Sequence, residues 1–446
     1  MSITTLVLIV YLAILLLIAF SSFSKINDHV DFFIARKKGN IFTITGSLVA
    51  TILGGSAIIG TIDEGPLIGW ATSWYMLCAS LGLLALIPLT SRVNRSGKFT
   101  LPELLGDLFD SKAKLISSVI IPVAWIGIIA AQIIAAARII QSFTGINYNT
   151  GVVISGLVFI FYTIAGGQIS VLKTDFFQAI LIVTGLVIVA FFAFKSRCNT
   201  ISSLTNLGLP FNIHFSPIDL LVLIITYSST FTTGPDIFSR IFCAKNESTA
   251  RKSVFIAAII LIPVALIIGF ISVYGSNCIP VVHKGSLLIE VCKDVLPTWG
   301  VAIITVSLLS AVLSSADTTI LSTSIILTEL FEKGDFGLKT LKKSRIMILL
   351  VGITSILIAL SFSSIIGILL IALTAYSGAF IIPIIAGLTG AKVVPERVTP
   401  AMITGGVVAL AGKIIFYSGL TGAGNAVIIS SFVLNGIILF SKKKPR

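Results

Sequence analysis

The stretch TILGGSAIIG, residues 51–60, places two glycines in the middle of an apolar segment that covers residues 41–62. An apolar segment of about 20 residues is long enough to cross a bilayer as a helix. Glycine adds backbone freedom, so Gly54 and Gly55 weaken this helix near its midpoint. We therefore expect a membrane helix that breaks halfway across.

A second interrupted segment lies further along the chain. FTTGPDIFSR (231–240) carries Gly234 and Pro235 at a similar depth, and proline removes a backbone hydrogen-bond donor. Either break on its own is compatible with a simple packing notch, which is common in membrane helices. Their matched placement favours two related halves, because transporters built from inverted repeats carry broken helices at corresponding positions.

The composition indicates an integral membrane protein. The 446 residues are 56% hydrophobic and 11% charged, with a mean hydropathy of +1.08, whereas soluble domains contain roughly 25% charged residues. The first apolar segment lacks the basic start and the cleavage site of a signal peptide, so we expect it to be retained. We predict thirteen spanning segments, at residues 2–22, 41–62, 66–90, 115–141, 148–166, 170–194, 217–241, 251–275, 298–330, 344–362, 365–390, 399–417 and 423–440.

The net charge of +13 reports topology rather than nucleic-acid binding. Of the 31 lysines and arginines, 25 fall in alternate connections, which lie on one side of the membrane when thirteen helices are assumed. Arg240 is one of these 25 residues. Basic connections face the cytoplasm, so the N-terminus is expected outside and the C-terminus inside. The five cysteines allow a bridge between Cys278 and Cys292 but do not require it.

The two predicted breaks lie five helices apart, so we interpret the chain, residues 1–446, as one transmembrane domain with two five-helix repeats of opposite orientation. The first repeat covers residues 41–195 and the second covers residues 196–392. An extra helix and loop (1–40) precede them, and two helices with a basic tail (393–446) follow.

Several stretches together resemble the sodium:solute symporter family, which includes the proline, pantothenate, sialic acid and sodium/glucose transporters. The resemblance covers about residues 30–415 and rests on DFFIARKKGN (31–40), SLVATILGGSAIIG (47–60), FTLPELLGDLF (99–109), AAQIIAAARII (130–140), YTIAGGQISVLKTDFFQAILI (162–182), GPDIFSRIFCAKNESTAR (234–251), LLSAVLSSADTTILSTSIILTEL (308–330) and FIIPIIAGLTGAK (380–392). It implies an all-α, LeuT-like 5+5 fold, alternating access and sodium-driven uptake.

The resemblance also implies a shared sodium site. Its ligands are expected to be the carbonyls of Ala50, Leu53 and Ala311 and the hydroxyls of Ser314 and Ser315. Broken membrane helices free carbonyls for such ions. The alternative for the two serines is a hydrogen bond to the preceding turn of their own helix, a frequent role for serine in membranes.

The family resemblance also implies a second sodium site, which would lie between Asp175, Ser314, Asp317 and Thr318. An intramembrane carboxylate normally faces a cavity or a partner, because exposure to lipid costs roughly 3 kcal/mol or more. The same residues are equally compatible with a protonation site or an ion exit path. Asp175 has a further alternative, a favourable position at the positive end of a helix dipole.

The solute is expected near the two breaks. The predicted binding residues are Gly54, Gly55, Ser56, Gln132, Gly234, Pro235 and Asp236. The run from Gly54 to Ala57 offers little for sugar hydroxyls, and the GP-x-I-x-x-R pattern (234–240) resembles the proline-transporter branch. Asp236 would suit an ammonium group, and capping or pairing with a nearby cation is the alternative. Arg138 either contacts a substrate carboxylate or extends to the membrane interface.

The sequence thus predicts sodium-coupled symport of a small organic solute, such as proline or a small carboxylate, by a multi-pass protein of the cell membrane. Its expected partners are the solute, sodium and the lipid bilayer, without nucleic acid. Proton-coupled or uncoupled transport by the same fold is the alternative. An enzyme is disfavoured because no H-E-x-x-H or G-x-S-x-G motif is present, and a channel or a sensor fits the closed ion site and the short tail less well.

Overall fold

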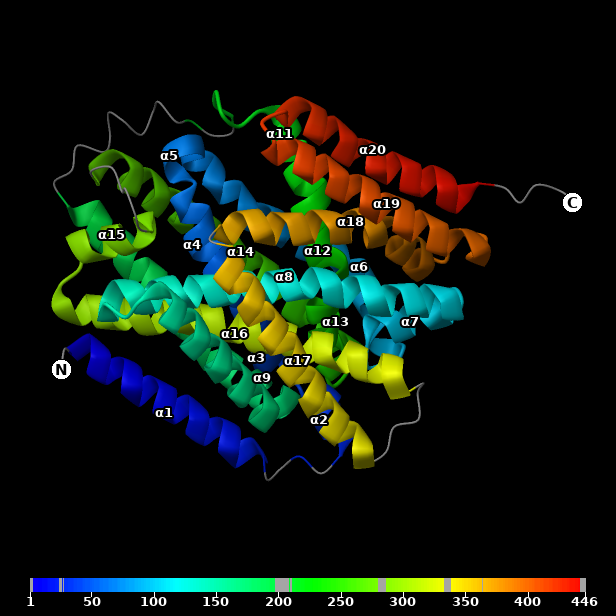
Figure 1. Ribbon diagram of the computed structural model, residues 1–446, viewed down its shortest axis with the longest axis horizontal. Coiled ribbons are helices and arrows are strands. Elements are labelled where there is room, and N and C mark those ends of the chain that lie inside the picture. The colour runs from blue at the N-terminus through cyan, green and yellow to red at the C-terminus, as the bar shows by residue number, and fades with distance from the viewer. Residues whose placement is uncertain are drawn as a thin grey trace, which may run out of the picture.

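The computed structural model describes residues 3–23, 28–196, 211–279, 286–332, 338–362 and 364–441, together with Ile26 and Gly208. The described chain is helical and contains no β-sheet (Figure 1). In chain order the helices are α1 (Ile3–Phe23), α2 (His29–Ile34), η1 (Ala35–Lys37), α3 (Ile41–Ile52), α4 (Gly55–Asp63), α5 (Gly65–Ile68), η2 (Gly69–Thr72), α6 (Ser73–Arg95), α7 (Leu101–Leu108), α8 (Ser111–Thr144), α9 (Tyr148–Lys195), α11 (Pro217–Leu223), η3 (Ile224–Ser228), α12 (Ser229–Thr233), α13 (Pro235–Cys243), α14 (Glu247–Cys278), α15 (Leu287–Val295), α16 (Thr298–Glu332), α17 (Leu338–Ser361), α18 (Ile365–Thr389), α19 (Pro395–Tyr417) and α20 (Thr421–Phe440).

Nine of the described helices are long and apolar enough to cross a bilayer, and the bent pair α3 and α4 makes a tenth. Each of the thirteen predicted segments falls on a helix or on a set of consecutive helices, with two of them inside α9. The all-helical membrane class is therefore confirmed, whereas the count of thirteen crossings stays a prediction.

Helix α9 changes direction at Gly167, where the backbone adopts φ 49° and ψ −163°. A Cβ atom at this position would lie 2.5 Å from the ring of Phe32, so both the conformation and the space require glycine. Across the bend, the hydroxyls of Tyr162 and Thr174 lie 2.7 Å apart. The bend separates the two segments that the sequence predicted as distinct helices.

Both predicted breaks are present, and they share one backbone geometry. Gly54, between α3 and α4, has φ −62° and ψ 151°, and Gly234, between α12 and α13, has φ −62° and ψ 137°. In each case the glycine carbonyl accepts a hydrogen bond from the residue four positions on, which starts the second half-helix. The two matched interruptions therefore form in the same way.

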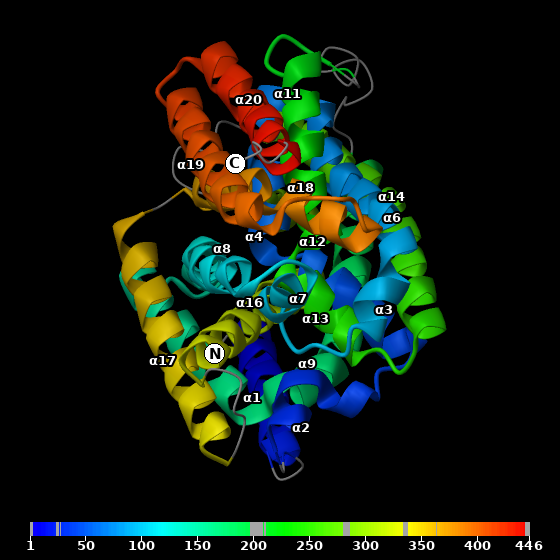
Figure 2. The same cartoon turned by 90° about the vertical axis from the view of Figure 1, so that its right-hand side faces the viewer.

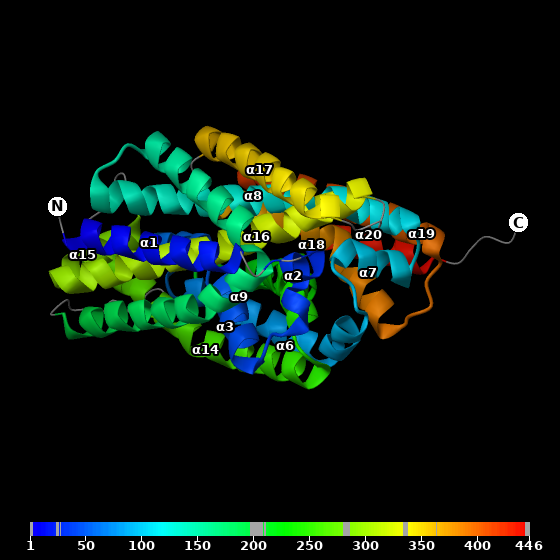
Figure 3. The same cartoon turned by 90° about the horizontal axis from the view of Figure 1, so that it is seen from below.

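Helix α16 is the central element of the bundle. Every residue from Ile304 to Ile326 is buried, and the helix contacts α1, α3, α8, α9 and α17. Views along two further directions show it enclosed by these neighbours (Figures 2 and 3). By contrast, large apolar side chains of α14, α17 and α19 are exposed on the outside, as expected for helices that face lipid.

One end of the bundle, here called the basic end, is defined by contacts between basic residues and neighbouring helix ends. The Lys114 ammonium at the start of α8 lies 2.5 Å from the Glu329 carboxylate near the end of α16, and Lys343 of α17 lies 2.5 Å from Glu332. Lys37, before α3, donates to the Asn94 carbonyl of α6. Helix α1 starts at the opposite end of the molecule from the end of α20 (Figure 1).

Cys278 and Cys292, whose bridge the sequence left open, are not bonded to each other. Cys292 is a buried free thiol, whereas Cys278 is disulfide-bonded. The two cysteines lie at the end of α14 and inside α15, and α15 turns the Cys292 side chain into the apolar interior.

Candidate functional site

The first break leaves backbone carbonyls at the end of α3 without partners in their own helix. Two serines of α16 provide hydrogen-bond donors for these carbonyls. The Ser314 hydroxyl donates to the Ala50 carbonyl at 2.9 Å, and the Ser315 hydroxyl donates to the Thr51 carbonyl at 2.7 Å. Both serines are therefore turned across the helix interface, and the purely intrahelical alternative does not describe them.

Three of the predicted shared sodium ligands, Ala50, Ala311 and Ser314, meet at this interface. Besides its contact with Ala50, the Ser314 Oγ atom lies 3.1 Å from the Ala311 carbonyl oxygen. Leu53 ends α3 with a non-helical backbone, φ −78° and ψ 46°. Ser315 differs, because its hydroxyl is bonded to Thr51. The donor set of carbonyls and hydroxyls contains only hard oxygen atoms, which fits a sodium ion.

Gln132 of α8 completes the first break from the other side. Its Oε1 atom accepts a hydrogen bond from the Ser56 N–H at 3.1 Å, which satisfies a free donor at the start of α4. A Cβ atom on Gly54 would lie 2.5 Å from Ser315 Oγ and 2.6 Å from Gln132 Nε2. Glycine is therefore needed where the three elements meet, and Gly55 packs equally closely on Val312.

The second break is satisfied by a different residue. The Tyr376 hydroxyl of α18 donates to the Thr233 carbonyl at 2.7 Å, at the end of α12. Tyr376 also packs edge-on against Trp125, with ring centroids 4.6 Å apart. Asp236 lies in the first turn of α13, and its buried Oδ1 atom has no hydrogen-bond partner among the described residues.

A small cavity lies between the two breaks. It offers about 40 Å³ to water-sized molecules. Its walls come from α3, α4, α8, η3, α12, α13, α16 and α18 and include the predicted residues Gly54, Ser56, Gln132 and Asp236. Gly55, Gly234 and Pro235 do not line it. Three polar atoms of lining residues, Ser56 Oγ, Trp125 Nε1 and Asp236 Oδ1, are buried without partners in the described chain.

An outer cavity of about 320 Å³ adjoins the central one. Tyr75 lines the outer cavity and Tyr227 the central one, and their rings meet edge to face at 5.5 Å. Glu64 also lines the outer cavity. Arg138 lies 3.9 Å from Asp63 and is absent from the lining of the central cavity.

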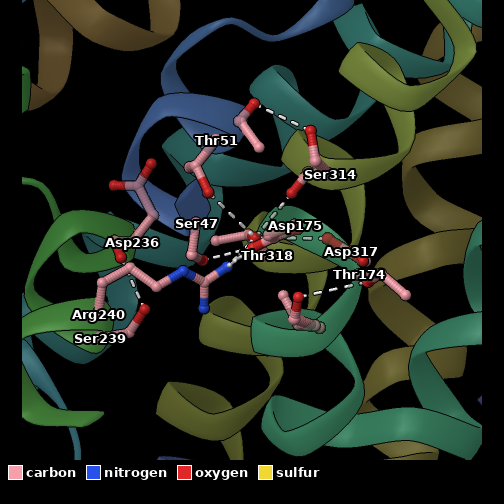
Figure 4. A network of polar contacts seen from close by, with 12 residues as sticks. Ser47, Thr51, Thr174, Asp175, Asp236, Ser239, Arg240, Ser314, Asp317 and Thr318 are labelled. Atoms are coloured by element: carbon pink, nitrogen blue, oxygen red, sulfur yellow. Dashed lines mark hydrogen bonds and ion pairs between the residues drawn. The ribbon is translucent and has the colours of Figure 1, made fainter. Parts of the chain in front are cut away.

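The predicted second site is a fully buried polar cluster (Figure 4). Asp175 Oδ2 accepts hydrogen bonds from the Ser47 hydroxyl and, at 3.2 Å, from Arg240 Nη2. The same nitrogen donates to the Thr318 hydroxyl oxygen. The Thr318 hydroxyl also lies 3.3 Å from Asp317 Oδ1. Three of the four predicted side chains, those of Asp175, Asp317 and Thr318, are thus gathered, but with an arginine among them. The fourth residue, Ser314, joins the cluster through its backbone carbonyl.

Arg240 is the residue of this cluster that the sequence placed wrongly. It was grouped with the basic residues at the cytoplasmic edge, yet it is 0% exposed. The signal was available, because Arg240 shares the broken segment 231–240 with Asp236. Asp175 lies two turns beyond the bend at Gly167, so its partner is the arginine rather than a helix terminus.

Trp125, Tyr227 and Tyr376 were not singled out by the sequence either. Two of them line the central cavity, and the third supports the second break. Their only sequence signal is a polar atom on an otherwise apolar helix, which a membrane protein shows at many positions.

Two broken helices, freed carbonyls facing serine hydroxyls, and a central cavity define this protein as a secondary active transporter. The chain belongs to the sodium:solute symporter family, which it matches over residues 32–393. It is therefore a sodium-coupled, multi-pass transporter of the cell membrane and not an enzyme.

Relatives and solved structures agree with this class. The sodium/proline symporter of Escherichia coli (strain K12) is 23% identical over 466 residues, covering 97% of this chain and 91% of the relative. A Na+-coupled sialic acid symporter in a substrate-bound, outward-open state is similar in structure, with a TM-score of 0.81 at 18% identity over 100% of this chain and 99% of the other. Mhp1, a nucleobase-cation-symport-1 family transporter, has a TM-score of 0.60 at 15% identity over 92% and 96%.

Proposed function

We propose that this protein takes up a small zwitterionic amino acid, with proline as the first candidate, together with sodium. The observation that carries the proposal is the central cavity with its unpartnered polar atoms. Asp236 Oδ1 is a buried acceptor, and Trp125 Nε1 is a buried donor. A buried polar group without a partner is expensive, so a ligand that satisfies both is favoured.

The chemistry of the cavity supports an amino acid over a sugar. Asp236 suits a primary or secondary ammonium group, whereas the Trp125 N–H and the Ser56 hydroxyl suit a carboxylate. Among the cavity residues from Gly54 to Ala57, only Ser56 carries a polar side chain. The sodium/proline symporters among the relatives favour the same substrate class, and a small carboxylate is the second candidate.

Sodium is proposed to bind at the shared site formed by the carbonyls of Ala50, Leu53 and Ala311 and the hydroxyls of Ser314 and Ser315. An ion at this position would tie α3 to α16. One charge that moves inward through about 100 mV releases about 2.3 kcal/mol, and a tenfold sodium gradient adds about 1.4 kcal/mol. One sodium ion therefore supports accumulation of a neutral solute by roughly several hundred-fold.

A second sodium ion at Asp175, Ser314, Asp317 and Thr318 remains a proposal with a condition attached. Arg240 Nη2 already contacts Asp175 and Thr318. The guanidinium must therefore move before a second ion can use these two oxygens.

The proposed topology has thirteen crossings, with the N-terminus outside and a LeuT-like core of two five-helix repeats, residues 41–195 and 196–392. The common geometry of Gly54 and Gly234 supports the repeats. An odd number of crossings places the termini on opposite sides, which agrees with the opposite positions of the start of α1 and the end of α20.

Thermal stability of the purified protein, measured with L-proline, other amino acids, pantothenate, sialic acid, sugars and small carboxylates in sodium and in potassium, tests the proposed function. Saturation at a hundredfold excess over the dissociation constant stabilises a protein by about 2.7 kcal/mol. We expect a shift with proline or a related zwitterion in sodium only. An equal shift in potassium would indicate proton-coupled or uncoupled transport instead.

A further inference from the structure

The buried cluster around Arg240 lies between the proposed sodium site and the basic end of the bundle. Thr318 follows Ser314 by one turn of α16, about 6 Å, in the direction of Glu332. Ser47 precedes Ala50 on α3 and is therefore nearer to the basic start of that helix. Arg240 lies in α13, beyond the second break and near the contact of Cys243 with Gly39.

The contacts of the arginine link four elements. Its guanidinium extends from α13 toward α9 and α16 (Figure 4), where Nη2 contacts Asp175 and Thr318. Asp175 in turn accepts the hydroxyl of Ser47 from α3. Thr318 donates to the Ser314 carbonyl at 2.7 Å, so the cluster is joined directly to the residue that carries the proposed sodium ligand.

The cluster is fully buried, contains ionisable side chains and is incompletely bonded. Arg240, Asp175 and Asp317 are each 0% exposed. Arg240 Nε and Nη1, Asp175 Oδ1 and Asp317 Oδ2 have no hydrogen-bond partner within the described residues. A buried charge is strongly penalised unless it is paired, and spare bonding capacity of this kind is compatible with rearrangement.

We infer that the Arg240 guanidinium is a tethered cation that closes the path of sodium from its site toward the basic end. A sodium ion that leaves Ser314 in this direction meets a fixed positive charge bonded to the two oxygens it would use next. Like charges at short range in a buried site repel strongly. The ion passes only when α13 moves and carries the guanidinium away from Asp175 and Thr318.

The inference goes beyond the proposed function and rests on its sodium site. A closing role for Arg240 can be distinguished from a purely structural ion pair with Asp175, because a structural pair affects stability alone. A closing cation also controls sodium leakage without solute. The readout is therefore solute-independent sodium flux, measured with ²²Na⁺ in vesicles that hold the purified protein under an inside-negative potential.

Arg240→Gln removes the charge and keeps hydrogen-bonding capacity, so solute-independent sodium flux should rise about tenfold or more over that of the unaltered protein. Arg240→Lys keeps the charge and should stay within about twofold. Thr318→Val keeps Arg240 but removes one anchor, and its flux should lie between these values. Arg95→Gln removes an exposed positive charge, which pairs with Glu247, and should leave the flux unchanged.

Sodium-dependent thermal stabilisation of each variant shows that it is folded and still binds the ion. If Arg240→Gln and Thr318→Val are both folded by this criterion and neither raises the solute-independent sodium flux, the inference is overturned. The proposed function is then left intact. If Arg240→Gln does not fold, the flux of Thr318→Val decides. Absence of sodium stabilisation in the unaltered protein would overturn the sodium site and this inference with it.

Discussion

The two broken helices have nearly the same backbone at their glycines but very different surroundings. At the first break, the carbonyls of Ala50 and Thr51 are satisfied by hydroxyls of α16. At the second break, the Thr233 carbonyl is satisfied by the Tyr376 phenol, and a carboxylate follows in the next turn. The repeated backbone geometry frees backbone polar groups at two places, and the side chains that face each break decide what it binds.

In the proposed function, the first break binds sodium and the second binds the amino group of the solute. A hydroxyl oxygen that donates to a carbonyl can become a ligand when an ion enters, because both oxygens have free lone pairs. Asp236 Oδ1 is buried without a hydrogen-bond partner among the described residues, so a donor from a bound solute would stabilise it. Substitutions at the two breaks should therefore have separable effects.

The largest effect is expected at Gly54, where α3, α8 and α16 meet. Gly54→Val should abolish uptake, because the added carbons collide with Ser315 Oγ and Gln132 Nε2, at 2.5 and 2.6 Å from the first of them. Initial rates of radiolabelled proline uptake in vesicles measure this loss. Gly422→Val is the matched control, because no atom lies within 4 Å of its added Cβ. Normal uptake by a folded Gly54→Val protein would remove the first break from the mechanism.

Asp236→Asn should weaken solute binding by about ten- to a hundredfold, because a hydrogen bond to a charged group contributes about 1.5–3 kcal/mol. Proline saturation curves at high sodium measure the effect. The exposed Asp294→Asn serves as the control for loss of a carboxylate. An unchanged proline affinity would separate the second break from the solute.

Ser314→Ala should raise the sodium concentration for half-maximal uptake about tenfold, since it removes one ligand oxygen, while the maximal rate at saturating sodium changes less. Ser307→Ala, on the same helix, removes a hydroxyl that bonds only to the Ile303 carbonyl and should leave the sodium dependence unchanged. Equal sodium dependence in both variants would contradict the shared site.

Tyr376→Phe should have the smallest effect of the four. It removes one hydrogen bond to Thr233 and keeps the ring against Trp125. The expected loss is about 0.5–1.5 kcal/mol, seen as a severalfold weaker proline affinity with an unaltered sodium dependence. Tyr417→Phe, at an exposed position in the outer cavity, is the control. A change in sodium dependence would show that the two breaks are coupled.

Features that depend on the chemistry of single residues could be predicted from the sequence. Gly54, Gly234 and Pro235 interrupt apolar runs, so both breaks could be placed from the sequence. Ser314 and Asp317 were identifiable because polar groups are rare at the centre of such a helix. Gln132 was found for the same reason and does cap the first break.

The remaining features depend on which helices meet. Arg240 has a basic neighbourhood in sequence, and only the approach of α9 and α16 turns it into a buried partner of Asp175. Trp125 and Tyr376 are ordinary aromatic residues until their helices cross beside the cavity. The sequence left the pairing of Cys292 open, because spacing along the chain does not report the direction of a side chain.

Equilibrium binding of radiolabelled L-proline at a series of sodium concentrations, compared among the unaltered protein, Ser314→Ala and Asp236→Asn, tests the division of labour between the breaks most directly. The weaker proline binding of Ser314→Ala should be restored by saturating sodium, whereas that of Asp236→Asn should persist at every sodium concentration. Restoration of both variants by sodium, or of neither, would contradict the assignment of sodium to the first break and of the solute to the second.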